Sequence, residues 1–241
     1  MSATHEVLLE AQAVAKHFGG VKALRDVSLS IRKGEVYGLI GPNGAGKTTF
    51  FNCMTGLYVP DGGGFVFDGA PLKADAPHKA AERGIARTFQ NIRLFGNMTA
   101  LDNVMVGRHV RTRSGVFGAM LRNRAAREEE AAIRRRAEEL LHYVGVEDRA
   151  DDLAKNLSYG DQRRLEIARA LATEPKLLCL DEPAAGMNGT ETEELRLLIE
   201  GIRADGVTIL LIEHDVKLVM GLCDRVAVLD YGALIIEDVP S

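Results

Sequence analysis

The chain has 241 residues, of which 46% are hydrophobic and 27% charged, and its formal net charge at pH 7 is −4. This acidic balance argues against a protein that binds nucleic acid by bulk positive charge, so no nucleic-acid partner is expected. No run of about 18 apolar residues could span a bilayer, and the start MSATHEVLLE lacks a signal-peptide pattern. Three cysteines, Cys53, Cys179 and Cys223, stand in apolar runs and are expected to be reduced core residues.

The first part of the chain has a β pattern. Residues 6–40 are expected to form short strands separated by turns, and Lys33-Gly34 is one turn signal. The apolar run 35–41 predicts a strand that leads into a glycine-rich loop. Residues 47–57 are typical of a helix, and residues 62–69 of a turn followed by a short strand.

The middle of the chain, from about residue 98 to 172, has a helical pattern with few strand signals. Arginines cluster between residues 108 and 136, with glutamates among them. This mixture favours a solvated helix face with pairs four residues apart, such as Glu130 with Arg134. The alternative is a docking face for an acidic or membrane-proximal partner, because local positive charge stands out on an acidic protein.

The last third returns to alternating strands and helices. Residues 176–183 and 207–215 are near-continuous apolar runs of strand length, each ending in polar residues and followed by a helical pattern. Strands buried on both faces of a parallel sheet have this composition, and such sheets bind ligands at the carboxyl ends of their strands. Asp181, Glu182 and His214 are therefore expected at one sheet edge, beside the glycine-rich loop.

The segment GPNGAGKT at 41–48 has the P-loop spacing and stands between an apolar strand and a helix. Glycines let the backbone N–H groups wrap around phosphates, the Lys47 ammonium can reach the β- and γ-phosphates, and the Thr48 hydroxyl can bind Mg²⁺. The pattern predicts a nucleotide site rather than a plain glycine turn. The expected nucleotide-binding residues of this loop are Gly41, Pro42, Asn43, Gly44, Ala45, Gly46, Lys47, Thr48 and Thr49.

Two adjacent carboxylates end the strand in LLCLDEP. Asp181 is predicted to hold Mg²⁺, directly or through a water, and Glu182 is the predicted base that orients and deprotonates an attacking water. The alternative for Glu182 is a negative charge at a helix N-terminus, which the helix dipole would favour.

Three further side chains are weaker candidates. His214 is expected to donate a hydrogen bond to the γ-phosphate, although a lone histidine is more often structural. The Gln90 amide can reach both Mg²⁺ and the attacking water. Phe18 can stack on an adenine or be a packed core aromatic.

A second anion site is predicted at LSYGD, where Ser158 and Gly160 stand before the helical run RRLEIARALA. Backbone N–H groups at a helix N-terminus attract negative charge. From the residues alone, this is only a spare anion site.

The order of these motifs along the chain resembles the ATP-binding subunits of ABC transporters, over essentially the whole length. The resemblance implies an α/β fold, a P-loop NTPase core of the ABC ATPase type. Its sheet would be mostly parallel, with an N-terminal antiparallel β region and an inserted α-helical subdomain. It implies one nucleotide-binding domain, 1–241, with a RecA-like core at 1–90 and 173–241 and the helical subdomain at 91–172. It also implies ATP and Mg²⁺, and two subunits packed head to tail, in which Ser158 and Gly160 hold the γ-phosphate of the partner's ATP.

Two segments, ARTFQNIRLFGNMTALDNVMVGRH and LSYGDQRRLEIARALATEPKLLCLDEPAAGMN, are similar to the ATPase subunits of branched-chain amino-acid importers. This branch implies membrane permease subunits, a second ATPase subunit in a homo- or heterodimer, and, indirectly, a periplasmic or extracellular substrate-binding protein. The expected location is peripheral, on the cytoplasmic face of the inner membrane. Members of the branch commonly run somewhat past the IIEDVPS at the end of this sequence.

Alternative functions are a urea or amide importer ATPase and a soluble ABC ATPase not coupled to transport. A P-loop kinase or GTPase is disfavoured, because no Asn-Lys-x-Asp base reader is present and the LSYGD loop would have no role.

The sequence departs from the usual family signature Leu-Ser-Gly-Gly-Gln at Tyr159 and Asp161, and Asn188 replaces a usual Asp. The Asp161 carboxylate is expected to face away from phosphate or to bond to the backbone.

Overall fold

The fold is described from a computed structural model of the chain, which describes residues 6–73, 76–108 and 124–240. The chain divides into two compact units, the first formed by Met1–Gln90 with Lys176–Ser241 and the second by Asn91–Pro175. Much of the predicted arginine cluster, residues 109–123, lies outside the described residues.

The first unit contains a six-stranded sheet with the strand order β10-β9-β3-β8-β7-β6. The five strands from β9 to β6 in this order pair in parallel with their neighbours, and β10 pairs antiparallel to β9. All residues of β7 and β8 are buried, as their continuous apolar runs predict. The bounds are β3 Val36–Ile40, β6 Ile85–Arg87, β7 Leu177–Asp181, β8 Thr208–Ile212, β9 Arg225–Asp230 and β10 Ala233–Asp238.

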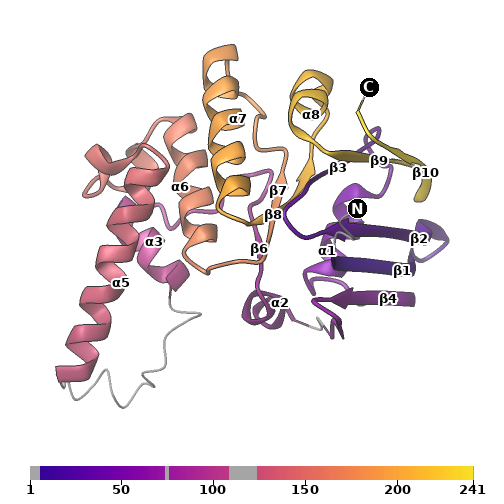
Figure 1. Cartoon of the computed structure of the whole chain (residues 1–241), viewed down its shortest axis with the longest axis horizontal. Coiled ribbons are helices and arrows are strands. Elements are labelled where there is room, and N and C mark those ends of the chain that lie inside the picture. The colour runs from indigo at the N-terminus through magenta and orange to yellow at the C-terminus, as the bar shows by residue number, and fades with distance from the viewer. Residues whose placement is uncertain (1–5, 74–75, 109–123, 241) are drawn as a thin grey trace, which may run out of the picture. The chain divides into compact units, whose positions relative to one another are not determined.

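A second sheet of this unit has four strands in the antiparallel order β2-β1-β4-β5. Helix α1 lies between the two sheets, and α7 and α8 lie on the other side of the six-stranded sheet (Figure 1). The α1 side chains Phe50, Phe51 and Met54 are fully buried in the core that the two sheets share. The bounds are β1 Val7–Phe18, β2 Val21–Arg32, β4 Gly62–Phe67, β5 Ala70–Pro71, α1 Lys47–Met54, α2 Pro77–Arg83, α7 Gly189–Ala204 and α8 Val216–Leu222.

The expectation of short strands in residues 6–40 is wrong for the first two strands, which have 12 residues each. The pairing of β1 with β2 shifts register between Ala11 and Val14, where Ala13 has a φ of 48°. A bulge of this kind inserts a residue into the strand, so the side chains beyond it alternate between the two faces of the sheet in the opposite order. The local pattern therefore looks like separate short runs, although one strand continues through it.

Helices α3, α5 and α6 pack on one another in the second unit. The crossing of α3 and α6 needs a glycine, because a Cβ at Gly107 would lie 2.3 Å from the carbonyl oxygen of Arg169. The predicted pair of Glu130 with Arg134 is wrong, since Arg134 pairs with Glu138 at 3.0 Å. The bounds are α3 Ala100–Arg108, α5 Arg124–Tyr143 and α6 Tyr159–Leu171, with short 3₁₀ turns at Glu147–Arg149 and Ala154–Asn156.

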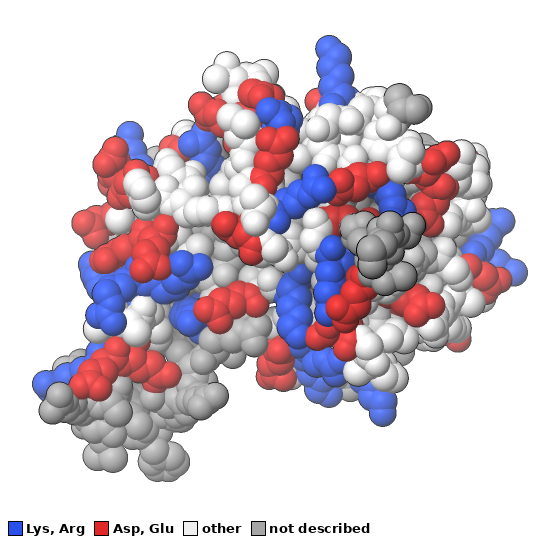
Figure 2. Space-filling view, in the orientation of Figure 1, with Lys and Arg blue, Asp and Glu red and all other residues white. Residues whose placement is uncertain are grey.

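Surface charge and helix hydropathy bear on possible partners. Acidic and basic side chains are interspersed on the face shown in Figure 2. Among the described residues, no helix has the length and apolar character needed to cross a bilayer.

The three cysteines are free and buried, as predicted. Burial raises the pKa of Cys53 to about 11 and that of Cys223 to about 12, and it holds the pKa of Cys179 well above its usual range. Because the thiolate is the reactive form, we expect no thiol of the native chain to react with Ellman's reagent at pH 8 within minutes. All three should react after unfolding in guanidinium. A thiol that reacts in seconds in the native protein would contradict this burial.

Candidate active site

The glycine-rich loop joins β3 to α1 at the carboxyl end of β3. Two of its glycines are required by close backbone neighbours. A Cβ at Gly41 would lie 2.1 Å from the Leu229 carbonyl oxygen, and one at Gly46 would lie 2.6 Å from the Ala23 carbonyl oxygen. Gly46 also has a φ of 105°, which side chains other than glycine rarely adopt. The loop is therefore held against β2 and β9 in the strand–loop–helix context that the motif requires.

Lys47 begins α1 and is only 7% exposed. Its ammonium donates to the carbonyl oxygens of Gly41, at 2.6 Å, and Pro42, at 3.1 Å. The ammonium is thus held over the loop by two neutral acceptors. Phosphate oxygens carry more negative charge and would be stronger acceptors for the same group.

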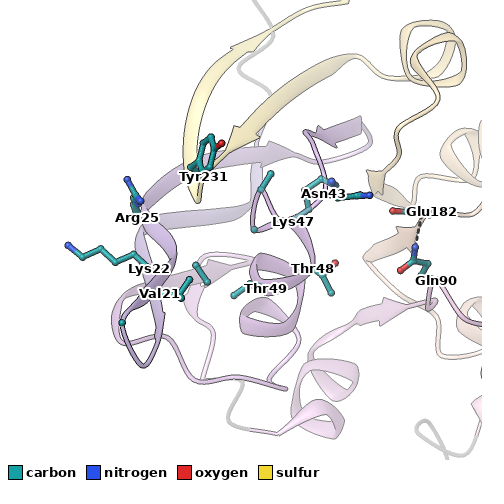
Figure 3. Close-up of a pocket in the computed structure, with 15 residues that line it drawn as sticks. Val21, Lys22, Arg25, Asn43, Lys47, Thr48, Thr49, Gln90, Glu182 and Tyr231 are labelled. Carbon is teal, nitrogen blue, oxygen red and sulfur yellow. Dashed lines mark hydrogen bonds between the residues drawn. The ribbon is translucent and has the colours of Figure 1, made fainter.

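One pocket contains most of the predicted loop residues together with Gln90 and Glu182 (Figure 3). Its lining residues are Gly20, Val21, Lys22, Ala23, Arg25, Asn43, Gly44, Ala45, Gly46, Lys47, Thr48, Thr49, Gln90, Glu182 and Tyr231.

Sequence reasoning missed one wall of this pocket, which comes from β2 and from the turn between β9 and β10. The turn is attached to the glycine-rich loop, because the Gly232 N–H donates to the Ala45 carbonyl oxygen at 2.9 Å. It is also attached to β2, because the Arg25 N–H donates to the Gly232 carbonyl oxygen at 2.7 Å. The Tyr231-Gly232 dipeptide is a turn signal, but nothing local places it beside a loop at residues 41–46.

Phe18, the predicted adenine-stacking residue, does not line this pocket. Its ring lies edge-on to that of Tyr58, with centroids 5.3 Å apart, and the residue is 44% exposed. It is therefore a half-exposed aromatic at the end of β1 and not a core residue. Its stacking role stays a prediction.

The structure brings Gln90, Glu182 and His214 together. The Gln90 amide Nε2 donates to Glu182 Oε2 at 2.7 Å, and His214 Nδ1 lies 3.8 Å from the same oxygen (Figure 3 draws the first contact). Glu182 has a φ of 47°, and its N–H donates to the Ile212 carbonyl oxygen of β8. A left-handed conformation in a residue other than glycine is strained, and such strain clusters at functional sites.

The alternative interpretation of Glu182, as a charge at a helix N-terminus, is wrong. The next helix, α7, begins at Gly189 and is capped by the Asn188 side chain. Glu182 instead lies in the turn that leaves β7, with a side chain that is 16% exposed. The carboxylate is thus available at the sheet edge.

Asp181 ends β7 and is 4% exposed. Its Oδ2 pairs with the Arg87 guanidinium at 2.9 Å, a partner that sequence reasoning did not identify. Burial raises the pKa of the Asp181 carboxyl above its ordinary value, and the hydrogen bond and charge of Arg87 oppose that shift. Both effects act on the carboxylate predicted to bind a cation.

The predicted metal ligands near the pocket fit a hard cation that is bound partly by the protein and partly by a nucleotide. Thr48, Gln90 and Asp181 offer only oxygen ligands, the type that Mg²⁺ prefers. Among the described residues, no group of three or more His, Cys, Asp or Glu could hold a metal ion by itself. Mg²⁺ is commonly bound through one or two carboxylates plus substrate phosphates, which agrees with this sparse set.

The second predicted anion site lies in the second unit, where Ser158 is the N-cap of α6. The Ser158 Oγ accepts from the Asp161 N–H at 3.1 Å and donates to the Asp161 carboxylate at 2.7 Å. The Asp161 carboxylate therefore accepts from the serine hydroxyl and not from a backbone group, and its orientation away from phosphate stays a prediction. Tyr159, which replaces the usual glycine, accepts from the Arg163 guanidinium at 2.9 Å through its phenol oxygen.

A glycine-rich loop between a parallel strand and a helix, with carboxylates at the end of another strand of the same sheet, defines a P-loop nucleotide-hydrolysing enzyme. A family model described as "ABC transporter" matches residues 24–185, more than half of the chain. The chain therefore belongs to the ABC transporter family, as an ATPase.

Relatives and solved structures agree with this assignment. The chain is 45% identical to the high-affinity branched-chain amino acid transport ATP-binding protein LivG of Salmonella typhimurium, over 97% of this chain and 92% of LivG. A nucleotide-free ATP-binding cassette from an ABC transporter superposes with a TM-score of 0.85 at 32% identity, covering 98% of this chain and 92% of that one. A dimeric ATP-binding cassette bound to ADP and Pi superposes with a TM-score of 0.81 at 28% identity, covering 97% and 99%.

Proposed function

We propose that this chain is the ATP-hydrolysing subunit of an ABC importer and powers the uptake of branched-chain amino acids through separate membrane subunits. The observation that carries the substrate class is the 45% identity to LivG over almost the full length of both chains. The observation that supports hydrolysis is the group formed by Gln90, Glu182 and His214 beside the P-loop.

Nucleotide binding is assigned to the P-loop, residues 41–49. Its backbone N–H groups hold the phosphates, and Lys47 moves its donors from two loop carbonyls to the β- and γ-phosphates. Phe18 stacks on the adenine from the end of β1. The exchange of neutral acceptors for charged ones favours the nucleotide complex.

Hydrolysis is assigned to Glu182, which accepts a proton from the attacking water. The Gln90 amide donates to Glu182 Oε2 at 2.7 Å and so orients the Glu182 carboxylate. His214, 3.8 Å away, donates to the γ-phosphate and stabilises the charge that develops there. Thr48, Gln90 and Asp181 would hold Mg²⁺, which neutralises charge on the β- and γ-phosphates when it is bound.

The proposed working unit is a dimer in which each ATP lies between the P-loop of one subunit and Ser158 and Gly160 of the other. The dimeric cassette bound to ADP and Pi supports a dimer of such cassettes. In this chain the Ser158 hydroxyl must leave the Asp161 carboxylate to donate to a phosphate. A homodimer and a heterodimer with a second ATPase subunit are both compatible with this arrangement.

The proposed partners are membrane permease subunits and, indirectly, a periplasmic or extracellular substrate-binding protein. The name of the relative as a transport ATP-binding protein supports this assignment. The chain would then be a peripheral protein on the cytoplasmic face of the inner membrane.

An uptake experiment separates the proposed substrate class from its alternatives. Replacing the native copy in the source cells by the Glu182→Gln variant should abolish high-affinity uptake of labelled leucine, isoleucine and valine. Uptake of labelled urea should be unchanged. Loss of urea uptake alone would assign the chain to a urea importer, and no change in either would indicate an ATPase not coupled to these transporters.

A further inference from the structure

Arg87 is the last residue of β6, three positions before Gln90, and its side chain is almost fully buried. Its guanidinium contacts two other segments of the first unit, α1 and the end of β7. One nitrogen donates to Asp181 Oδ2 at 2.9 Å, and another donates to Asn52 Oδ1 at 2.6 Å. Because Asn52 belongs to α1, which begins at Lys47, the guanidinium connects the P-loop helix to the carboxylate that ends β7.

Further contacts hold the guanidinium in place. Its central carbon lies over the rings of Phe51 and Phe89, at 5.2 Å and 5.0 Å from their centroids. The residue after Arg87 holds the main chain of Asp181, because the Asp181 N–H donates to the hydroxyl of the buried Thr88 at 3.4 Å. The carboxylate thus has a set position and one oxygen, Oδ2, already occupied.

Stability alone does not account for this arrangement. Buried ion pairs commonly contribute little to folding, because desolvation offsets their attraction. Among the described residues, the Arg87 Nε is buried without a hydrogen-bond partner. An unsatisfied buried donor is costly, and a native structure that retains one needs another reason for it.

We propose that Arg87 is a positioning residue for Asp181, which holds Oδ2 so that Oδ1 alone faces Mg²⁺ bound with the nucleotide. This inference rests on the proposed function, and it adds Arg87 to the residues on which Mg²⁺ binding depends. Arg87 touches neither nucleotide nor metal in this scheme and acts through the carboxylate. Partners of this kind orient metal ligands, and their loss typically weakens metal affinity by about 10- to 100-fold.

The test compares ATP binding by calorimetry in EDTA with binding at increasing Mg²⁺ concentrations, using the full chain. In Arg87→Met, ATP affinity in EDTA should remain within about twofold of the unmodified chain. The Mg²⁺ concentration that gives half of the metal-dependent gain should rise by about 10- to 100-fold. Arg87→Lys should recover part of this loss, because it keeps the charge but not the two-pronged geometry.

Two further variants keep the test decisive if Arg87→Met does not fold. Asn52→Ala removes an anchor of Arg87 but leaves both charges, and it should raise the Mg²⁺ requirement in the same direction by a smaller factor. Arg203→Met is the matched control. It breaks the ion pair between Arg203 and Asp224, which lies beside the start of β3 and so at the end of the sheet away from Asp181. This control should leave the Mg²⁺ requirement unchanged.

Two outcomes would overturn the positioning role. One is an unchanged or lower Mg²⁺ requirement in both Arg87→Met and Asn52→Ala. The other is an equal loss of ATP affinity with and without Mg²⁺, which indicates a purely structural role. If the unmodified chain itself gains no ATP affinity from Mg²⁺, the proposed function fails, and this inference fails with it.

Discussion

The Glu182→Gln variant should bind ATP normally and hydrolyse it about 10²- to 10⁴-fold more slowly than the unmodified chain, because an amide cannot accept the proton of the attacking water. The change keeps the local geometry, since a glutamine oxygen can still accept the 2.7 Å hydrogen bond from Gln90. The measurement is phosphate release at saturating MgATP, with binding measured separately.

The same variant tests the shared ATP site. Without hydrolysis, MgATP should hold the closed dimer, which light scattering detects as a doubling of mass. Adding Ser158→Ala should abolish the dimer, because the hydroxyl proposed to hold the partner's γ-phosphate is gone. A chain that binds ATP tightly yet stays monomeric would show that closure needs a different partner, such as a second ATPase subunit or the membrane subunits.

The matched control for Glu182→Gln is Glu193→Gln on α7, which makes the same chemical change at an exposed ion pair with Arg196. Exposed pairs of this kind contribute little to stability, so this control should hydrolyse ATP at the unmodified rate. Hydrolysis by Glu182→Gln at a similar rate would remove Glu182 from the role of base.

The Lys47→Ala variant should weaken ATP binding by about 10- to 100-fold, because charge-assisted hydrogen bonds contribute about 1.5–3 kcal/mol each. The lysine is almost fully buried at the start of α1, where its only described acceptors are the carbonyls of Gly41 and Pro42. Equilibrium binding of a fluorescent ATP analogue gives the affinity directly.

Lys22→Ala is the control for Lys47→Ala, since it removes the same charge from the wall of the same pocket. The Lys22 side chain extends away from the P-loop in Figure 3. Water and salt screen such an exposed charge, so the affinity should change by less than about threefold. Equal losses in both variants would mean that the net charge of the pocket, and not the position of Lys47, determines binding.

The sequence predicted the family and fold class, because the motifs that carry them are contiguous. The P-loop lies within nine residues, 41–49, and the strands that end at Asp181 and Ile212 are continuous apolar runs. The sequence misled where such a local pattern is interrupted. The bulge near Ala13 breaks the alternation of side chains, so one long strand looks like several short ones. The sequence also did not identify the Ser158 hydroxyl as the partner of the Asp161 carboxylate.

By itself, the sequence determined which side chains are candidates for the chemistry, since a lysine, an aspartate and a glutamate at these local positions suit phosphate and Mg²⁺. Only the tertiary structure decided how those groups are held. Arg87 and Asp181 are 94 positions apart in the chain, and Gln90 and Glu182 are 92 apart. Such pairs form because parallel strands bring their carboxyl ends to one edge, and no local periodicity records which strands are neighbours. The Tyr231 turn reaches the P-loop for the same reason, because β9 pairs directly with β3.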